Sequence, residues 1–166
     1  TGRLFPQTYE VLSSTIIKYN KKIDIYFPDY EDIEKMVTEK GPLSFYKSVE
    51  NRKECCSIRK VIPLNRALTG MKCWISGIRA DQSDNRGNMD WIEYDEDKKL
   101  FKIYPLFDWT FNEVTSLAKE NNVPYNLLHD KGFVSIGCQP CTKAIEPGED
   151  FRAGRWWWEN DGPKEC

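Results

Sequence analysis

Residues 58–78 read IRKVIPLNRALTGMKCWISGI, a stretch that predicts a helix followed by a strand. Apolar side chains have helical spacing over residues 58–68, and Pro63 predicts a break or restart, because proline is tolerated in a first turn but not in a helix interior. Residues 71–78 are mostly apolar, which indicates a buried strand. A helix that leads into a strand is typical of α/β layered folds.

The sequence before this stretch shows the same alternation. Helical spacing of apolar residues covers positions 9–19, and the alternating residues 23–27 predict a strand. Two further helices are expected over residues 29–40 and 43–49.

After the predicted strand, the polar residues 79–90 indicate a loop. Residues 91–94 and 100–104 predict two strands joined by a charged turn, which form a hairpin or a sheet edge. The sequence TFNE at the start of residues 110–121 has the form of a capping box, which opens a helix. The rest of the chain is expected to be mostly loop.

Strands that alternate with helices predict an α/β fold with a mainly parallel sheet, in a single domain of residues 1–166. In such folds, ligand sites lie beyond the carboxyl ends of the strands. The chain has 166 residues, of which 40% are hydrophobic and 30% are charged, which is typical of a globular protein and not of a disordered one.

Charge and hydrophobicity exclude two classes of partner. A net charge of -2 argues against binding a nucleic-acid backbone, which normally requires an excess of clustered Lys and Arg. No apolar run approaches the roughly twenty residues needed to span a bilayer, and the first residues lack the features of a signal peptide. We therefore expect a cytoplasmic protein. The chain lacks an initiator Met, so we also expect that either end is a processing or fragment boundary.

Four of the six cysteines form two pairs, Cys55 with Cys56 and Cys138 with Cys141. A disulfide framework is not expected without an export signal. Structural zinc usually takes pairs with a short spacer, which adjacent cysteines fit poorly. An iron–sulfur cluster has several irons, so adjacent side chains can each reach a different one. The pattern favours a cluster, while a zinc site, a lone redox C-x-x-C motif and buried thiols remain alternatives.

Cationic residues flank both pairs, and a cluster with four thiolates is an anion that favours nearby cations. These residues are Arg52, Lys53, Arg59, Lys60 and Lys143. Cys73 lies within the predicted strand and is interpreted as a small core residue.

Five motifs are distinctive in combination: CCSIRKVIPLNRAL at 55–68, SGIRADQS at 76–83, GCQPCT at 137–142, GRWWWE at 154–159 and KEC at 164–166. Together they resemble the assimilatory adenylyl-sulfate and phosphoadenylyl-sulfate reductases, and the similarity runs from Thr1 to Cys166. The four paired cysteines look like the branch that carries a [4Fe-4S] cluster and prefers adenylyl sulfate.

The resemblance implies an adenine nucleotide α-hydrolase-like fold with a loop-rich C-terminal segment and a mobile tail. It also implies that residues 156–166 carry the nucleophile, Cys166, that thioredoxin is the reductant, and that sulfite and AMP are the products. The implied cluster ligands are Cys55, Cys56, Cys138 and Cys141. The implied substrate-binding residues are Lys60, which would link the cluster electrostatically to the substrate sulfate, Arg152, Arg155, Gly77, Arg79, Arg86, Thr1 and Gly2.

The chain departs from the family pattern in three places. The phosphate-binding loop of the family would precede Thr1, Gln7 stands where glutamate is usual, and the family commonly continues beyond Cys166. We therefore assign the expected function to a longer, intact protein.

The residues also suggest how such a reaction would proceed. Cleavage of the sulfur–oxygen bond requires a soft nucleophile, and the thiolate of Cys166 meets this requirement. Arg152 and Arg155 lie three positions apart, so both can face one anion. Of the consecutive residues Trp156, Trp157 and Trp158, at least one is expected outside the core. His129, the only histidine, is interpreted as structural.

Two alternatives remain open at this point. A phosphoadenylyl-sulfate reductase would catalyse the same class of reaction on a nucleotide with a 3′-phosphate. A non-enzymatic iron–sulfur or zinc module would leave the arginine and tryptophan motifs without a purpose. The sequence leaves the oligomeric state open, a homo-oligomer included.

Overall fold

The structure is a computed structural model that describes residues 1–159. The helices are α1 Pro6–Tyr19, α2 Tyr30–Lys40, α3 Val49–Cys56, α4 Ile62–Leu68, α5 Asp84–Gly87 and α6 Phe111–Glu120. The strands are β1 Cys73–Ile75, β2 Ile92–Asp95 and β3 Leu100–Ile103. Within residues 1–159, no helix is both long and apolar enough to cross a membrane.

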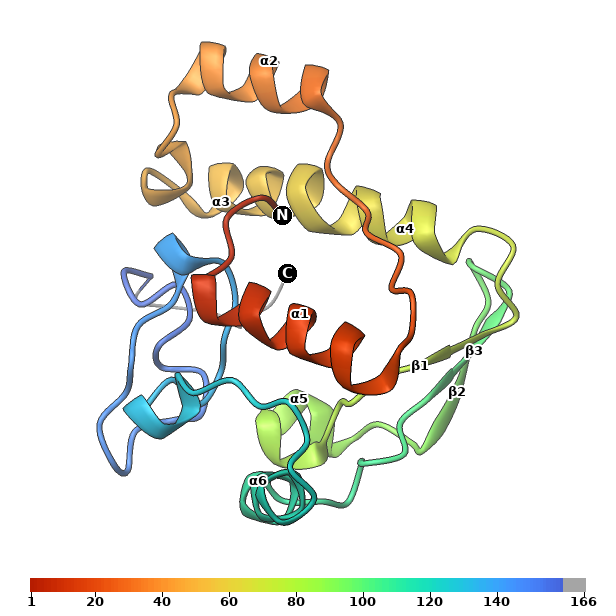
Figure 1. Cartoon of the computed structure of the whole chain (residues 1–166). Helices are drawn as coiled ribbons and strands as arrows, with labels where there is room; N and C mark the ends of the chain where they lie inside the picture. The colour runs from red at the N-terminus through yellow and green to blue at the C-terminus, as the bar shows by residue number, and fades with distance from the viewer. Residues whose placement is uncertain (160–166) are drawn as a thin grey trace.

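The sheet has the order β1-β3-β2 and confirms an α/β fold (Figure 1). Strand β1 pairs with β3 in parallel, and Trp74 lies opposite Lys102. Strands β2 and β3 form the predicted hairpin and are antiparallel, as a short connection requires. The described part of the sheet is therefore mixed, which corrects the expectation of a mainly parallel one.

Residues 49–68 form a nearly continuous helical run. Ser48 begins it, because its side chain accepts a hydrogen bond from the backbone of Asn51 at 3.2 Å. A π-helical segment, Ser57–Val61, separates α3 from α4, and Pro63 lies in the first turn of α4. The predicted break at Pro63 is thus a widened turn, which accommodates a residue without a backbone donor.

Two other helices begin as their sequences predict. The side chain of Asp29 accepts a hydrogen bond from Glu31 at the start of α2. Helix α6 has the complete capping box, in which Thr110 and Glu113 exchange side-chain and backbone hydrogen bonds.

Two predicted strands differ from the structure. Residues 23–27 form no strand, because no strand among the described residues lies beside them to complete a hydrogen-bonded ladder. The predicted strand over 71–78 contracts to β1, in which Ile75 is 68% exposed. Cys73 is therefore exposed and not a core residue, because β1 is an edge strand that the described residues leave largely uncovered.

Two other segments also differ. The helix expected over residues 43–49 is only a single 3₁₀ turn, Ser44–Tyr46, because extended Ser48 interrupts it and begins α3. The loop expected over residues 79–90 contains a 3₁₀ turn, Ala80–Gln82, and the short helix α5.

The buried core of the described chain lies beside the cysteine pairs. Met36, Phe45 and Trp156 pack there with Cys55 and Cys141. The loop-rich segment that follows α6 lies against the start of the chain and α3 (Figure 1). One contact between them is the hydrogen bond from the backbone of Gln139 to the carbonyl of Arg3 at 2.8 Å. Segments distant in sequence thus meet around the two cysteine pairs.

Candidate active site

Two neighbouring cavities share the side chains of Ile136 and Arg155. The first, of about 370 Å³, is lined by four arginines and is called the arginine cavity below. The second, of about 200 Å³, is lined by all four paired cysteines and is called the cysteine cavity. Arg155 lies in the wall between them.

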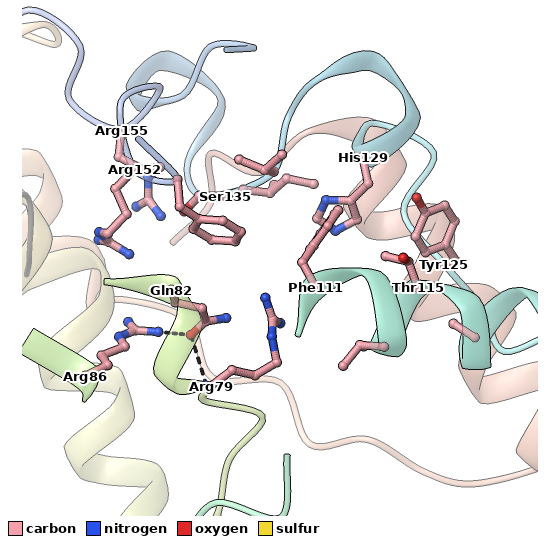
Figure 2. A pocket seen from close by; sticks show the side chains of 15 residues that line it. Arg79, Gln82, Arg86, Phe111, Thr115, Tyr125, His129, Ser135, Arg152 and Arg155 are labelled. Carbon is pink, nitrogen blue, oxygen red and sulfur yellow. Dashed lines mark hydrogen bonds between the residues drawn. The ribbon is translucent and has the colours of Figure 1, made fainter. Parts of the chain in front are cut away.

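Four arginines from separate parts of the chain converge on the arginine cavity: Arg79, Arg86, Arg152 and Arg155. Figure 2 shows Arg152 and Arg155 reaching in from the C-terminal segment toward Arg86 and Arg79 on the opposite wall. Guanidinium groups bind sulfate and phosphate oxygens through paired N–H donors. The convergence of four guanidinium groups is an arrangement suited to a multiply charged anion.

Two residues that the sequence interpretation did not single out hold the arginines in place. Asp81 accepts a hydrogen bond from Nε of Arg79 at 3.0 Å and one from the backbone of Phe111 at 2.7 Å. The side-chain oxygen of Gln82 accepts from Arg86 and from the backbone of Arg79 (Figure 2). The sequence could have indicated Asp81 and Gln82, because they lie in the motif SGIRADQS, whose polar residues form one tight turn.

Arg79 is 6% exposed, and its Nη2 atom has no hydrogen-bond partner within residues 1–159. Nε of Arg155 is likewise buried without a partner in this part of the chain. A buried unpaired donor is costly, and a donor on a charged group more so. Nη2 of Arg79 is therefore a donor available to an anionic oxygen in the arginine cavity, and Nε of Arg155 is one in the wall between the two cavities.

The opposite end of the arginine cavity is aromatic, with Phe111, Tyr125 and His129 (Figure 2). The ring nitrogen Nδ1 of His129 lies 2.7 Å from the carbonyl oxygen of Phe133, and burial lowers the pKa of the imidazole. A neutral ring that donates from Nδ1 fits the interpretation of His129 as a structural histidine. Burial, with a hydrogen bond to Asp130, also raises the pKa of Tyr125 to about 12.

The cysteine cavity brings together the two pairs that the sequence predicted to act together. Cys55 and Cys56 end α3, whereas Cys138 precedes the 3₁₀ turn Gln139–Cys141 and Cys141 is its last residue. The hydroxyl of Tyr46 donates a hydrogen bond to the carbonyl of Pro140 at 2.6 Å and holds this turn against the core. The backbone of Cys141 also donates to Cys138 at 2.9 Å, which closes the turn.

The cavity disfavours free thiolates. Burial raises the pKa of Cys55, and burial together with the nearby Cys138 and Cys55 raises that of Cys141 to about 12. Arg59, whose own pKa is lowered by burial, offsets part of the effect on Cys55. Thiolates grouped in this way require a positively charged partner such as a metal.

The chemistry of the residues that line this cavity is compatible with an iron–sulfur cluster. Nε of Arg59, Nε of Arg155 and Nε1 of Trp156 are buried and have no hydrogen-bond partner in the described chain. Donors around grouped sulfurs suit an anionic cluster, whose sulfur atoms accept hydrogen bonds.

Only some of the other predicted site residues line one of the two cavities. Lys60 and Thr1 line the cysteine cavity, and Gly2 lies beside Arg59. Gly77 follows β1 and is not among the residues that line either cavity. Cys166 lies outside the described residues. These assignments therefore stay predictions.

Gly137 is a further site residue that the sequence interpretation named only within a motif. A side-chain carbon at this position would overlap the guanidinium of Arg155. Gly154 is equally confined, because a side-chain carbon there would overlap the carbonyl of Lys143. Both glycines thus allow the arginine-bearing segment to pass close to the cysteine-bearing turn.

The phosphoadenosine phosphosulfate reductase domain family matches residues 1–144 of this chain. The chain belongs to this family. That membership confirms the resemblance predicted from the sequence, and the reductases of the family are oxidoreductases that act on sulfur.

Curated relatives cover the whole of this chain. It is 47% identical to an adenosine 5′-phosphosulfate reductase of Rhizobium tropici, of which it covers 92%. It is 45% identical to one of Agrobacterium fabrum and 46% identical to one of Allochromatium vinosum, of which it covers 64% and 65%. The chain thus spans about two thirds of the length of the latter two.

A solved structure agrees with the fold. The phosphoadenylyl-sulfate reductase of Candida auris, in a phosphate complex, matches with a TM-score of 0.69 and 30% sequence identity. The match covers 86% of this chain and 67% of that one. The predicted fold class is thereby confirmed within the family.

Proposed function

We propose that the intact protein reduces adenylyl sulfate to sulfite and AMP, with thioredoxin as the reductant, in assimilatory sulfate reduction and cysteine biosynthesis in the cytoplasm. The observation that carries the proposal is the position of Arg155 between an arginine-lined anion cavity and a cavity lined by four cysteines. The names of the relatives support adenylyl sulfate as the substrate.

The cofactor that we propose is a [4Fe-4S] cluster. Cys55, Cys56, Cys138 and Cys141 would hold it, and Lys60 lines the same cavity. When bound, such a cluster would supply a fixed negative charge next to the substrate site. Arg155, which lines both cavities, would then lie between the cluster and the substrate anion, and Lys60 would add positive charge on the cluster side.

The residues of the chain divide the reaction into two steps. The four arginines bind the anionic oxygens, and the thiolate of Cys166 attacks the sulfur, so that a sulfur–sulfur bond forms and the sulfur–oxygen bond to AMP breaks. A thiolate of thioredoxin then attacks the sulfur of Cys166, and sulfite leaves with the electron pair. The second thiol of thioredoxin resolves the mixed disulfide, so the dithiol supplies both electrons.

The experiment that tests this proposal is a single turnover without a thiol. Full-length protein, purified without oxygen, is mixed with adenylyl sulfate, and peptides are analysed for a sulfonate on Cys166. A parallel reaction with phosphoadenylyl sulfate tests the alternative substrate. A sulfonate formed faster from adenylyl sulfate supports the proposal. No sulfonate from either nucleotide would contradict it.

Lys60→Ala should slow sulfonate formation by about a hundredfold at unchanged iron content. The reason is that Lys60 lines the cysteine cavity without ligating metal, so its charge acts on the transition state and not on cluster assembly. Rates are measured in a rapid-quench single turnover and iron by colorimetry. Loss of iron with an unchanged rate per cluster would assign Lys60 a structural role.

Gly137→Ala should weaken binding of adenylyl sulfate by about tenfold or more, because the added methyl group displaces the Arg155 guanidinium from the wall between the cavities. Binding is measured as the concentration dependence of sulfonate formation. Gly87→Ala is the matched control, since a side-chain carbon at Gly87 meets nothing within 4 Å. If both substitutions weakened binding equally, Arg155 would have no role in binding adenylyl sulfate.

A further inference from the structure

A buried ion pair joins α3 to the last described residues of the chain. Nε of Arg52 donates a hydrogen bond to Oε1 of Glu159, and Nη2 of Arg52 donates one to Oε2, each at 2.9 Å. The side chains of Arg52 and Glu159 are 2% and 7% exposed. The paired geometry fixes direction as well as distance, because a guanidinium and a carboxylate align in one plane.

The same guanidinium packs on Trp156, which is 1% exposed. Arg52 lies 4.5 Å from the ring centre, and Arg155 lies 4.7 Å from it. The backbone of Trp156 has φ 42°, a left-handed conformation that is unusual for a bulky residue and must be held by its surroundings. Its backbone N–H donates to the carbonyl of Cys141 at 3.2 Å.

We propose that Arg52 and Glu159 are positioning residues for the reaction, an inference that rests on the function proposed above. Arg52 precedes Cys55 and Cys56 by three and four positions, so it shares a helix face with them and lines the same cavity. Through Glu159 and Trp156 it fixes the C-terminal segment that bears Arg155 to the cysteine-bearing helix.

The pair also sets the point from which the nucleophile-bearing residues start. Cys166 follows Glu159 by seven positions, a length that spans at most about 25 Å when extended. Without the pair, the segment that bears Arg155 and Glu159 would be free to shift relative to the cysteine-bearing helix α3. A displacement of about 1 Å in a reacting group can cost about a hundredfold in rate.

The test compares Glu159→Gln with Glu54→Gln in the full-length, cluster-containing protein. Glu54 also lies on α3 and pairs with Lys40 at 2.7 Å, but both side chains are more than a third exposed and line neither cavity. Sulfonate formation is measured at saturating adenylyl sulfate, with iron content and KM. Hydrogen exchange of the peptide that contains Trp156 and Glu159 reports on the segment independently of activity.

Glu159→Gln should lower the saturating rate by about tenfold to a hundredfold, with iron content unchanged and exchange of this peptide faster. Glu159→Asp, which keeps the carboxylate, should restore part of the rate and covers the case in which Glu159→Gln does not fold. Glu54→Gln should behave like the parent.

A rate within twofold of the parent for Glu159→Gln, or a fall only in proportion to lost iron, would overturn the inference. If the parent itself forms no sulfonate, the proposed function fails instead. In that case unchanged hydrogen exchange in Glu159→Gln still contradicts the inference that the Arg52–Glu159 pair fixes this segment, and faster exchange supports it.

Discussion

Cys166→Ser should abolish sulfite release and leave no covalent sulfonate, while the protein still binds adenylyl sulfate and keeps its iron. A serine hydroxyl is scarcely ionised near neutral pH, whereas a thiolate is a strong nucleophile toward sulfur. Loss of a residue that forms the covalent intermediate typically costs about a millionfold in turnover. The measurement is sulfite production with thioredoxin, together with mass spectrometry of the C-terminal peptide.

The matched control is Cys73→Ser, because Cys73 is an exposed cysteine on β1 that lines neither cavity. This variant should turn over like the parent. If Cys166→Ser released sulfite at a rate near that of the parent, the nucleophile would have to be another group, and the two-step mechanism would be wrong.

The sequence predicted the α/β fold class and grouped the cysteines, whereas the roles of the site residues stay predictions. Spacing indicated two thiol pairs, the family resemblance implied that Cys55, Cys56, Cys138 and Cys141 act together, and the structure places all four on one cavity. Thiol pairs carry such information because their chemistry requires a shared partner. The strand over residues 23–27 was wrong, because an alternating pattern indicates a strand only where a neighbouring strand completes the ladder.

Other parts of the site depend on tertiary contacts that spacing does not encode. Gly137 and Arg155 are 18 positions apart, and only the close passage of their two segments shows why the glycine is needed. Arg52 was interpreted as one of several cations near the first pair, but its partner Glu159 lies more than a hundred positions away. Positive charge near a cysteine pair can be read from the sequence, but the carboxylate that pairs with each arginine cannot.

Cys56→Ser should remove the brown colour and most of the bound iron, and with them most of the sulfonate-forming activity. In the proposed cluster each of the four cysteines would contribute one thiolate, and a serine in its place neither ionises near pH 7 nor offers a soft sulfur ligand. We expect the same result for serine at Cys55, Cys138 or Cys141, since these side chains line the same cavity.

The measurements are visible absorption and iron per protein after anaerobic purification, with thermal unfolding to show that the variant folds. Cys166→Ser is the internal control, because it removes a thiol from the same protein and should leave the iron in place. Zinc in place of iron in the parent protein would instead support a zinc site. Full iron occupancy in Cys56→Ser would mean that the adjacent cysteines do not each bind an iron. The resemblance to the cluster-bearing branch would then no longer extend to its cofactor, and Lys60 and Arg155 would face a cavity without the fixed negative charge that their proposed roles require.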